Sequence, residues 1–257
     1  MTRIILCGCN GRMGQAIVRA TEQTENACIV AGVDVNPEAQ AAACSFPIYR
    51  NISEFPGKAD VIVDFSHHTA LPSLAEYACN TQTPMVIATT GHTEEEKALM
   101  VKVATKIALF ASGNMSIGIN LLIDLCRRAA KTLGEGFDIE IVEKHHNQKL
   151  DAPSGTALMI ANALREEREE TELVYDRHSV RKTREPKEIG MHSVRGGTIV
   201  GVHEVLFAGA NEMIELTHTA TSREVFADGA LKAAVYLAGK PAGFYSMTDL
   251  IQSVSNQ

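Results

Sequence analysis

The segment Val142–Met159, with the sequence VEKHHNQKLDAPSGTALM, carries residue types that could do chemistry. It holds two adjacent histidines, His145 and His146, followed by Lys149 and by a Ser-Gly-Thr triplet that begins at Ser154. Four interpretations are open: a metal site, a nucleophilic serine, an acid/base centre beside a bound anion, or a solvated polar loop.

Metal binding and serine nucleophilicity are both disfavoured by the local pattern. Neighbouring residues of an extended segment point to opposite sides, so His145 and His146 cannot easily chelate one ion. No HxH or HExxH spacing is present, and Lys149 adds a cation nearby. Ser154 follows Pro153 and lacks the GxSxG elbow. The run DAPSGTAL instead resembles a helix start, whose backbone N–H groups can hold an anion.

Acid/base chemistry is the third interpretation. A histidine titrates near neutrality and can pass a proton, whereas a lysine supplies a fixed positive charge or a proton. Together with an anion-binding helix start, the pair would suit a small carboxylate-bearing substrate that needs both a hydride and a proton. For an isolated histidine pair, a structural role would be the better interpretation. The choice between a structural and a chemical role therefore depends on whether the N-terminal half of the chain provides a site for a hydride-donating cofactor.

That half begins with a glycine-rich loop, RIILCGCNGRMGQAIVRA, in which Gly8, Gly11 and Gly14 lie between an expected strand and an expected helix. Such glycines let the backbone approach a pyrophosphate, whose charge then lies at the helix N-terminus. Asp34 ends the second expected strand and could accept hydrogen bonds from ribose hydroxyls. The sequence therefore predicts a dinucleotide site, in which Arg12 could support a phosphate.

The same carboxylate bears on the choice of cofactor. Asp34 disfavours a 2′-phosphate, and the next residues, Val35 and Asn36, supply no balancing cation. We therefore expect NADH to be preferred over NADPH. Ligands of open parallel sheets bind beyond the carboxyl ends of the strands, so the segments VDFS, ATTG and ASGN should also meet the cofactor.

The elements that would position these groups follow from periodicity. Up to Asn114, short apolar runs alternate with amphipathic stretches, as in a parallel sheet covered on both faces. We expect strands at Arg3–Gly8, Cys28–Asp34, Asp60–Phe65, Met85–Thr89 and Ile107–Ala111. We expect helices over residues 13–21, from about Thr69, and over 93–105, the last with a Thr93–Glu96 capping box.

Beyond Asn114 the pattern changes. We expect a long helix that ends at Gly134, followed by the strand FDIEIVEKHH and by a charge-rich segment to which we assign no chemistry. Three strands, expected to form an antiparallel meander, and a helix come after it. The prediction is an α/β fold in two domains: a doubly wound parallel sheet, and an α+β domain with an open, largely antiparallel sheet.

Composition limits the classes of partner. The net charge of −7 disfavours nucleic-acid binding, which needs a basic face. No apolar run is long enough to span a membrane and no signal peptide is evident, so we expect a cytoplasmic protein. The six cysteines lack disulfide or zinc spacing and are expected to be reduced and largely buried.

The motifs GCNGRMG, VDFS, ATTG, ASGNMSIGIN and above all EKHHNQKLDAPSGTA closely resemble the 4-hydroxy-tetrahydrodipicolinate reductase family, also called dihydrodipicolinate reductase. The resemblance runs in order along essentially the whole chain and ends with ELTHTATSREVFADGA. It implies NADH- or NADPH-dependent reduction of a cyclic imine dicarboxylate to tetrahydrodipicolinate, with loss of water, in diaminopimelate and lysine biosynthesis.

The resemblance also implies roles for individual residues. His145 would give and take the proton, and Lys149 would be the second proton-donating or polarising group. The residues implied to bind substrate are His146, Ser154, Gly155 and Thr156. Those implied to bind the cofactor are Gly8, Cys9, Asn10, Gly11, Arg12, Met13, Asp34, Ala88, Thr89, Thr90, Ser112, Gly113, Asn114 and Met115.

Domain limits and assembly follow from the same resemblance. It implies a dinucleotide-binding domain over residues 1–114 and 223–257, and a substrate-binding domain over 115–222 whose sheet builds a homotetramer. Some relatives that bind NADPH well carry an arginine where this chain has Val35, which agrees with the NADH expectation. Two alternatives are an NADH-binding regulator, for which a basic DNA-binding element is missing, and another dehydrogenase of this architecture, which the HHNQKLDAPSGT block disfavours.

Overall fold

Short buried strands alternate with helices through the N-terminal part of the computed structural model, which describes residues 1–39 and 44–255. The chain divides into two units, one formed by Met1–Ile117 with Arg223–Gln257 and the other by Gly118–Ser222. In the described parts of the chain, no helix combines the length and the apolar character that crossing a bilayer would require.

A seven-stranded parallel sheet forms the centre of the first unit, with the order β12-β6-β5-β4-β1-β2-β3. Because β2 and β4 lie on opposite sides of β1, the sheet has a switch point between β1 and β4, where ligands of such sheets bind. The strands are β1 (Thr2–Cys7), β2 (Ala27–Val33), β3 (Ile48–Tyr49), β4 (Val61–Asp64), β5 (Met85–Ile87), β6 (Ala108–Ala111) and β12 (Gly243–Tyr245).

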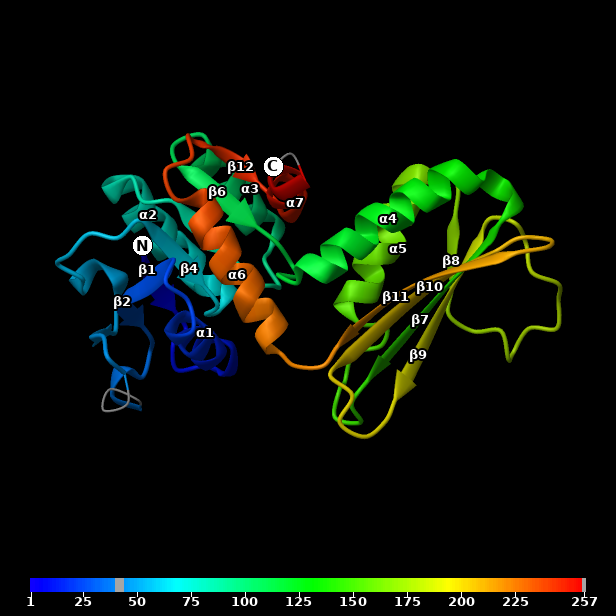
Figure 1. The fold of residues 1–257 in the computed structure, drawn as a ribbon, viewed down its shortest axis with the longest axis horizontal. Coiled ribbons are helices and arrows are strands. Elements are labelled where there is room, and N and C mark those ends of the chain that lie inside the picture. The colour runs from blue at the N-terminus through cyan, green and yellow to red at the C-terminus, as the bar shows by residue number, and fades with distance from the viewer. Residues whose placement is uncertain (40–43, 256–257) are drawn as a thin grey trace. The chain divides into compact units, whose positions relative to one another are not determined.

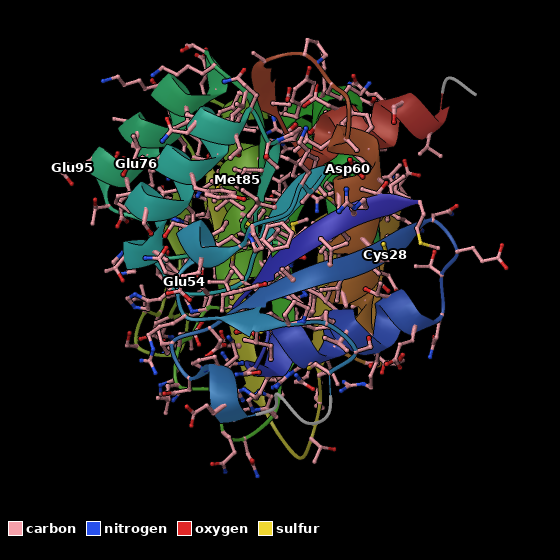
Figure 2. All side chains as sticks on the ribbon, turned by 90° about the vertical axis from the view of Figure 1, so that its left-hand side faces the viewer. Cys28, Glu54, Asp60, Glu76, Met85 and Glu95 are labelled. Carbon is pink, nitrogen blue, oxygen red and sulfur yellow. The ribbon has the colours of Figure 1, made fainter. Side chains whose placement is uncertain are left out.

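Helices cover both faces of this sheet, because successive strand residues point to opposite sides. Ile4 and Leu6 of β1 pack in one core with α1 (Arg12–Glu22), α6 (Glu224–Leu237) and α7 (Met247–Ser255). Ile5 and Cys7 pack on the other face with α2 (Leu71–Thr81) and α3 (Glu94–Ala104). In Figure 2, Glu76 and Glu95 lie on the outer side of the α2–α3 layer, whereas Met85 lies within the sheet.

The second unit is a five-stranded mixed sheet in the order β11-β10-β7-β9-β8, and α4 and α5 pack on one of its faces (Figure 1). The strand β7 alternates between buried and half-buried residues, so its odd-numbered side chains face the helices. The elements are α4 (Ile117–Leu133), β7 (Asp138–His145), α5 (Gly155–Glu167), β8 (Glu172–Val174), β9 (Glu188–Arg195), β10 (Gly201–Ala208) and β11 (Met213–Ala220). Short 3₁₀ turns occupy Pro37–Ala39, Ile52–Glu54, His68–Ala70 and Gly134–Gly136.

The expected fold class is confirmed: a parallel sheet covered on both faces, plus an open second sheet in which most paired residues are antiparallel. The capping box of Thr93 and Glu96 is present at the start of α3. The expected meander is confirmed for β10 and β11, which form an antiparallel pair, but is wrong for β9, which does not pair with β10. Strand β7 lies between them, parallel to β9 and antiparallel to β10, and pairing between such distant segments does not follow from local periodicity.

Candidate active site

The turn after β1 brings three backbone segments into close contact. Gly8 has a φ of +77°, and a side chain there would place Cβ 2.6 Å from the carbonyl oxygen of Phe65, beyond β4. A Cβ on Gly14 would lie 2.2 Å from the carbonyl oxygen of Gly8. Gly11 is the N-cap of α1 and leaves its first turn uncovered by a side chain. The sequence motif thus forms a bare backbone cradle at the switch point of the sheet, which fits a pyrophosphate.

Asp34 follows β2 with its carboxylate held in a fixed orientation. The backbone N–H of Asn10 donates to Oδ2 at 3.1 Å, and that of Asn36 donates to Oδ1 at 3.1 Å. A cavity of about 410 Å³ adjoins it, lined in part by Gly8, Gly11 and Asp34. Arg50 lines the same cavity. Arg50 was not among the residues expected from the sequence, because only the two-residue strand β3 brings it beside Asp34.

The loops after β5 and β6 meet at a second cavity of about 410 Å³ in the first unit. Its lining includes Thr89, Thr90, Ser112 and Gly113, which the sequence assigned to the cofactor. Beneath them lies the carboxyl group of Asp64, which accepts hydrogen bonds from the hydroxyls of Ser66 at 2.5 Å and Thr89 at 3.0 Å. Burial raises the pKa of Asp64, and the hydrogen bonds from Ser66 and Thr89 lower it and so offset part of that rise.

The remaining residues assigned to the cofactor differ in how far their side chains are buried. Ala88 and Met13 pack against the core, and the Met115 side chain is buried in it, so Met115 could offer a ligand only its backbone. Cys9 is fully buried, and burial raises the pKa of its thiol to about 12. This thiol is therefore protonated and unreactive in the folded protein at neutral pH.

Other members of that set lie in the turns themselves. Asn10 donates from its side chain to the carbonyl oxygen of Asn36 at 2.7 Å. Arg12 is the exposed first residue of α1. Asn114 is buried, and its side-chain oxygen accepts from the backbone N–H of Ser116 at 2.9 Å.

His145 ends β7 on the side of the sheet that the helices cover, next to Glu143. Nδ1 of His145 lies 2.5 Å from Oε2 of Glu143, whose side chain is 0% exposed. Arg195, at the end of β9, donates from Nη1 to Oε2 at 2.8 Å and from Nη2 to Oε1 at 2.7 Å. Burial alone would raise the pKa of Glu143, but hydrogen bonds from Arg195 and His145 hold it at about 2. Burial lowers the pKa of His145.

Ser154 is the N-cap of α5. Its hydroxyl oxygen accepts from the backbone N–H of Ala157 at 3.1 Å and lies 2.9 Å from Nε2 of His203. Because the hydroxyl oxygen accepts from the helix, its hydrogen is available to His203. His203 is buried on β10, and burial lowers its pKa to about 4, so it is neutral and can accept that hydrogen bond. The expected helix start is confirmed, but the hydroxyl caps the helix and contacts a histidine.

The other residues of the motif surround this cluster. Lys149 Nζ pairs with Asp151 Oδ1 at 2.9 Å, and the lysine side chain is 20% exposed. Nδ1 of His146 is buried without a hydrogen-bond partner. Gly155 and Thr156 form the first turn of α5, whose backbone N–H groups are not all used within the helix.

Three residues of this cluster escaped the sequence analysis: Glu143, Arg195 and His203. The signal for Glu143 was available, since residues two apart on a strand share a face and His145 was already singled out. Arg195 and His203 required the register. Arg195 is the parallel partner of His145, and His203 is the antiparallel partner of Glu143.

Comparison with known proteins bears on both units. The family model described as dihydrodipicolinate reductase, N-terminus, matches residues 2–115, and the model described as dihydrodipicolinate reductase, C-terminus, matches residues 118–251. A 4-hydroxy-tetrahydrodipicolinate reductase of Caldanaerobacter subterraneus is 51% identical over 98% of this chain and 99% of the relative. A protein of the same name from Clostridium novyi is 48% identical over 98% of this chain and 99% of the relative.

A solved structure adds a match in three dimensions. The dipicolinate-bound dihydrodipicolinate reductase of Paenisporosarcina has a TM-score of 0.79 and 26% identity to this chain. The superposition covers 96% of this chain and 97% of that one. Sequence and structure therefore agree over both units.

Proposed function

Because the chain belongs to the dihydrodipicolinate reductase family, we propose that it reduces 4-hydroxy-tetrahydrodipicolinate to tetrahydrodipicolinate, with loss of water, in diaminopimelate and lysine biosynthesis. The protein is an oxidoreductase that works with a nicotinamide dinucleotide. One observation carries the proposal: His145, Lys149 and the N-terminus of α5 belong to one unit whose sequence matches the family throughout.

We assign the first unit to the dinucleotide and the second to the substrate. The glycine cradle and Asp34 support the first assignment, since a Cβ at Gly8 or Gly14 would collide with the backbone of Phe65 or of Gly8 and the close-packed turn could not form. The N–H groups of the loop and of α1 would bind the pyrophosphate, and Asp34 would accept from ribose hydroxyls. When bound, the reduced nicotinamide supplies a hydride.

In the second unit, the backbone N–H groups of Gly155 and Thr156 and the side chain of His146 would bind a substrate carboxylate. Lys149 would place a positive charge beside the substrate nitrogen and stabilise charge that develops there. His145 would exchange a proton through Nε2, because Nδ1 is taken by Glu143. The buried position of His145 would exclude water from that transfer.

We also propose that NADH is preferred. The fixed carboxylate of Asp34 would repel a 2′-phosphate at short range. Arg50 lines the same cavity and could attract that phosphate, so it would account for residual use of NADPH.

We propose further that the protein is a cytoplasmic homotetramer built through the second sheet. Within the described residues, α4 and α5 pack on one face of that sheet, and the other face carries half-buried apolar side chains such as Val142, Val202 and Leu206. A sheet face of this kind is stabilised when another subunit covers it. Light scattering should give about four times the chain mass of 27.8 kDa, and a monomer would contradict the proposal.

The experiment that tests the activity follows oxidation of NADH with 4-hydroxy-tetrahydrodipicolinate made in place from pyruvate and aspartate semialdehyde. We expect turnover by the wild type and a loss of about 10²-fold or more in kcat for His145→Ala. NADH binding without turnover would instead favour a redox-sensing regulator. Wild-type rates from His145→Ala would refute the role of His145.

A further inference from the structure

We propose that Glu143 and Arg195 form a positioning pair that fixes the tautomer and orientation of His145. The inference rests on the proposed role of His145 in proton transfer. Neither residue is expected to touch substrate or cofactor, so both would act through the histidine. The pair joins two strands, because Glu143 lies on β7 and Arg195 lies at the end of β9, in register with His145.

Strand geometry places the carboxylate where it can hold the imidazole. Glu143 and His145 are two residues apart on β7, so both side chains project toward the helices. The carboxylate is 0% exposed and the imidazole 11% exposed. Nδ1 and Oε2 are 2.5 Å apart, the distance of a strong hydrogen bond.

Both oxygens of Glu143 are engaged, which leaves the carboxylate one orientation. Oε1 accepts from Arg195 Nη2 at 2.7 Å and from the backbone N–H of Ser154 at 3.2 Å. Oε2 accepts from Arg195 Nη1 at 2.8 Å and contacts the histidine. A forked guanidinium with two parallel hydrogen bonds fixes geometry as well as charge.

The protonation state follows from this environment. With its pKa held at about 2, Glu143 is ionised at neutral pH and can only accept hydrogen bonds. The hydrogen shared with His145 must therefore reside on Nδ1, and the neutral imidazole presents Nε2 as its free base. Nε2 faces Gly201, where a Cβ would lie only 3.1 Å away, so no protein side chain stands between this nitrogen and the backbone of β10.

Four ionisable groups face His145, and their effects differ in sign. Burial lowers the pKa of His145, Glu143 opposes this with a hydrogen bond and its charge, and the positive charges of Lys149 and Arg195 lower the pKa further. His203 lies edge-on with ring centroids 5.2 Å apart and is neutral near pH 7. Among these groups, Glu143 is thus the one that opposes the lowering of the His145 pKa.

Arg195 has a second contact that links the histidine to the substrate loop. Its Nη2 donates to the carbonyl oxygen of Asp151 at 2.7 Å, in the turn that precedes α5. The same guanidinium therefore holds two groups: the carboxylate of Glu143, which contacts His145, and the segment that carries Lys149. A purely structural ion pair would hold the loop equally well. The test must therefore measure a property of the histidine itself, namely its tautomer.

The direct test measures the histidine tautomer by NMR of the whole protein labelled with ¹⁵N-histidine, with His145→Gln to assign the signal. We expect the Nδ1–H tautomer for His145 in the wild type and a shift toward Nε2–H in Glu143→Gln. The wild-type measurement needs no Glu143 variant, only His145→Gln for the assignment, and an Nε2–H tautomer in the wild type would overturn the proposal. It also needs no substrate, so it is independent of the proposed activity.

The kinetic test compares Glu143→Gln with Glu167→Gln, which removes a carboxylate from the Arg127 pair at the far end of α5. We expect kcat of Glu143→Gln to fall about 10²-fold or more, with the Kd for NADH unchanged and the pKa in the kcat/KM profile lowered. Glu167→Gln should behave as wild type. Arg195→Lys keeps the positive charge but loses the two parallel hydrogen bonds of the guanidinium, and its kcat should lie between those of Glu143→Gln and Glu167→Gln. An unchanged pH profile in Glu143→Gln would refute the positioning role.

If the wild type failed to reduce 4-hydroxy-tetrahydrodipicolinate, the proposed function would be wrong while the tautomer result still stood. If it turned over normally and Glu143→Gln did too, only the positioning role would be wrong.

Discussion

The α-carbon of Gly201 lies against the imidazole of His145, so that a side-chain methyl there would come within 3.1 Å of Nε2. Gly201 is the first residue of β10 and pairs with Ala220 across the sheet, a position whose backbone any residue could adopt. Its lack of a side chain therefore matters for the histidine and not for a turn.

We accordingly expect Gly201→Ala to fold normally and to lose activity. The methyl would push the imidazole by a few tenths of an ångström, and displacement of a reacting group on that scale costs about tenfold in kcat. Gly196→Ala is the matched control, since no atom lies within 4 Å of a Cβ there. The prediction is checked by measuring the steady-state kcat of both variants, with thermal unfolding as the test that both are folded. Equal rates would mean that Nε2 does not need this space.

The ion pair of Lys149 with Asp151 leads to a second prediction. At 2.9 Å, the carboxylate holds the ammonium in the loop before α5, and the lysine side chain is mostly shielded from water. Lys149→Met should reduce kcat about 10²-fold, because it removes the charge beside the substrate nitrogen. Lys182→Met removes an ammonium that pairs with Glu185 and Glu188 in the same unit and should leave kcat unchanged. A Lys149→Met enzyme with wild-type kcat would remove the lysine from the chemistry.

Much of the first unit could be predicted from the sequence, because its strands are continuous apolar runs and its helices have clear periodicity. The glycine loop and Asp34 could be predicted as well, since each needs a particular residue at a particular strand end. The strands β3 and β12 escaped because two or three residues carry no measurable periodicity. Missing β3 also meant missing Arg50.

The second unit shows a different limit. His145, Lys149 and Ser154 lie close together in the sequence, so a local motif identified them. Arg195 and His203 reach the same place only through the insertion of β7 between β9 and β10, and pairing between distant strands is not encoded in any short window. Periodicity predicted four of the five strands of this sheet and missed β8, which lies in the charge-rich segment, and it could not predict which strand pairs with which.

His203 leads to a prediction on pH and stability. Its pKa is lowered from 6.5 to about 4 by burial, so the folded protein favours the neutral form more than the unfolded chain does. This contribution is fully present above pH 6.5 and is lost as the pH falls toward 4, by on the order of 3 kcal/mol. His203→Gln can still accept from Ser154 but cannot titrate.

The free energy of unfolding should therefore fall less steeply between pH 6.5 and 4 in His203→Gln than in the wild type. Denaturant titrations at several pH values measure this directly. Parallel curves for the two proteins would show that His203 does not titrate on unfolding, and a steeper curve for the variant would contradict the sign.

Asp34 and Arg50 lead to the last prediction, on cofactor choice. The carboxylate, held by two backbone N–H groups, and the guanidinium line one cavity and should have opposite effects on a 2′-phosphate. Arg50→Ala should lower kcat/KM with NADPH about tenfold, the loss of one charge-assisted hydrogen bond, and change NADH use little. Asp34→Ser should raise the ratio of NADPH to NADH use. Arg19→Ala, on the exposed side of α1, is the control for general loss of positive charge. A wild type that clearly prefers NADPH would show that the attraction of Arg50 exceeds the repulsion of Asp34, and the predicted NADH preference would be wrong.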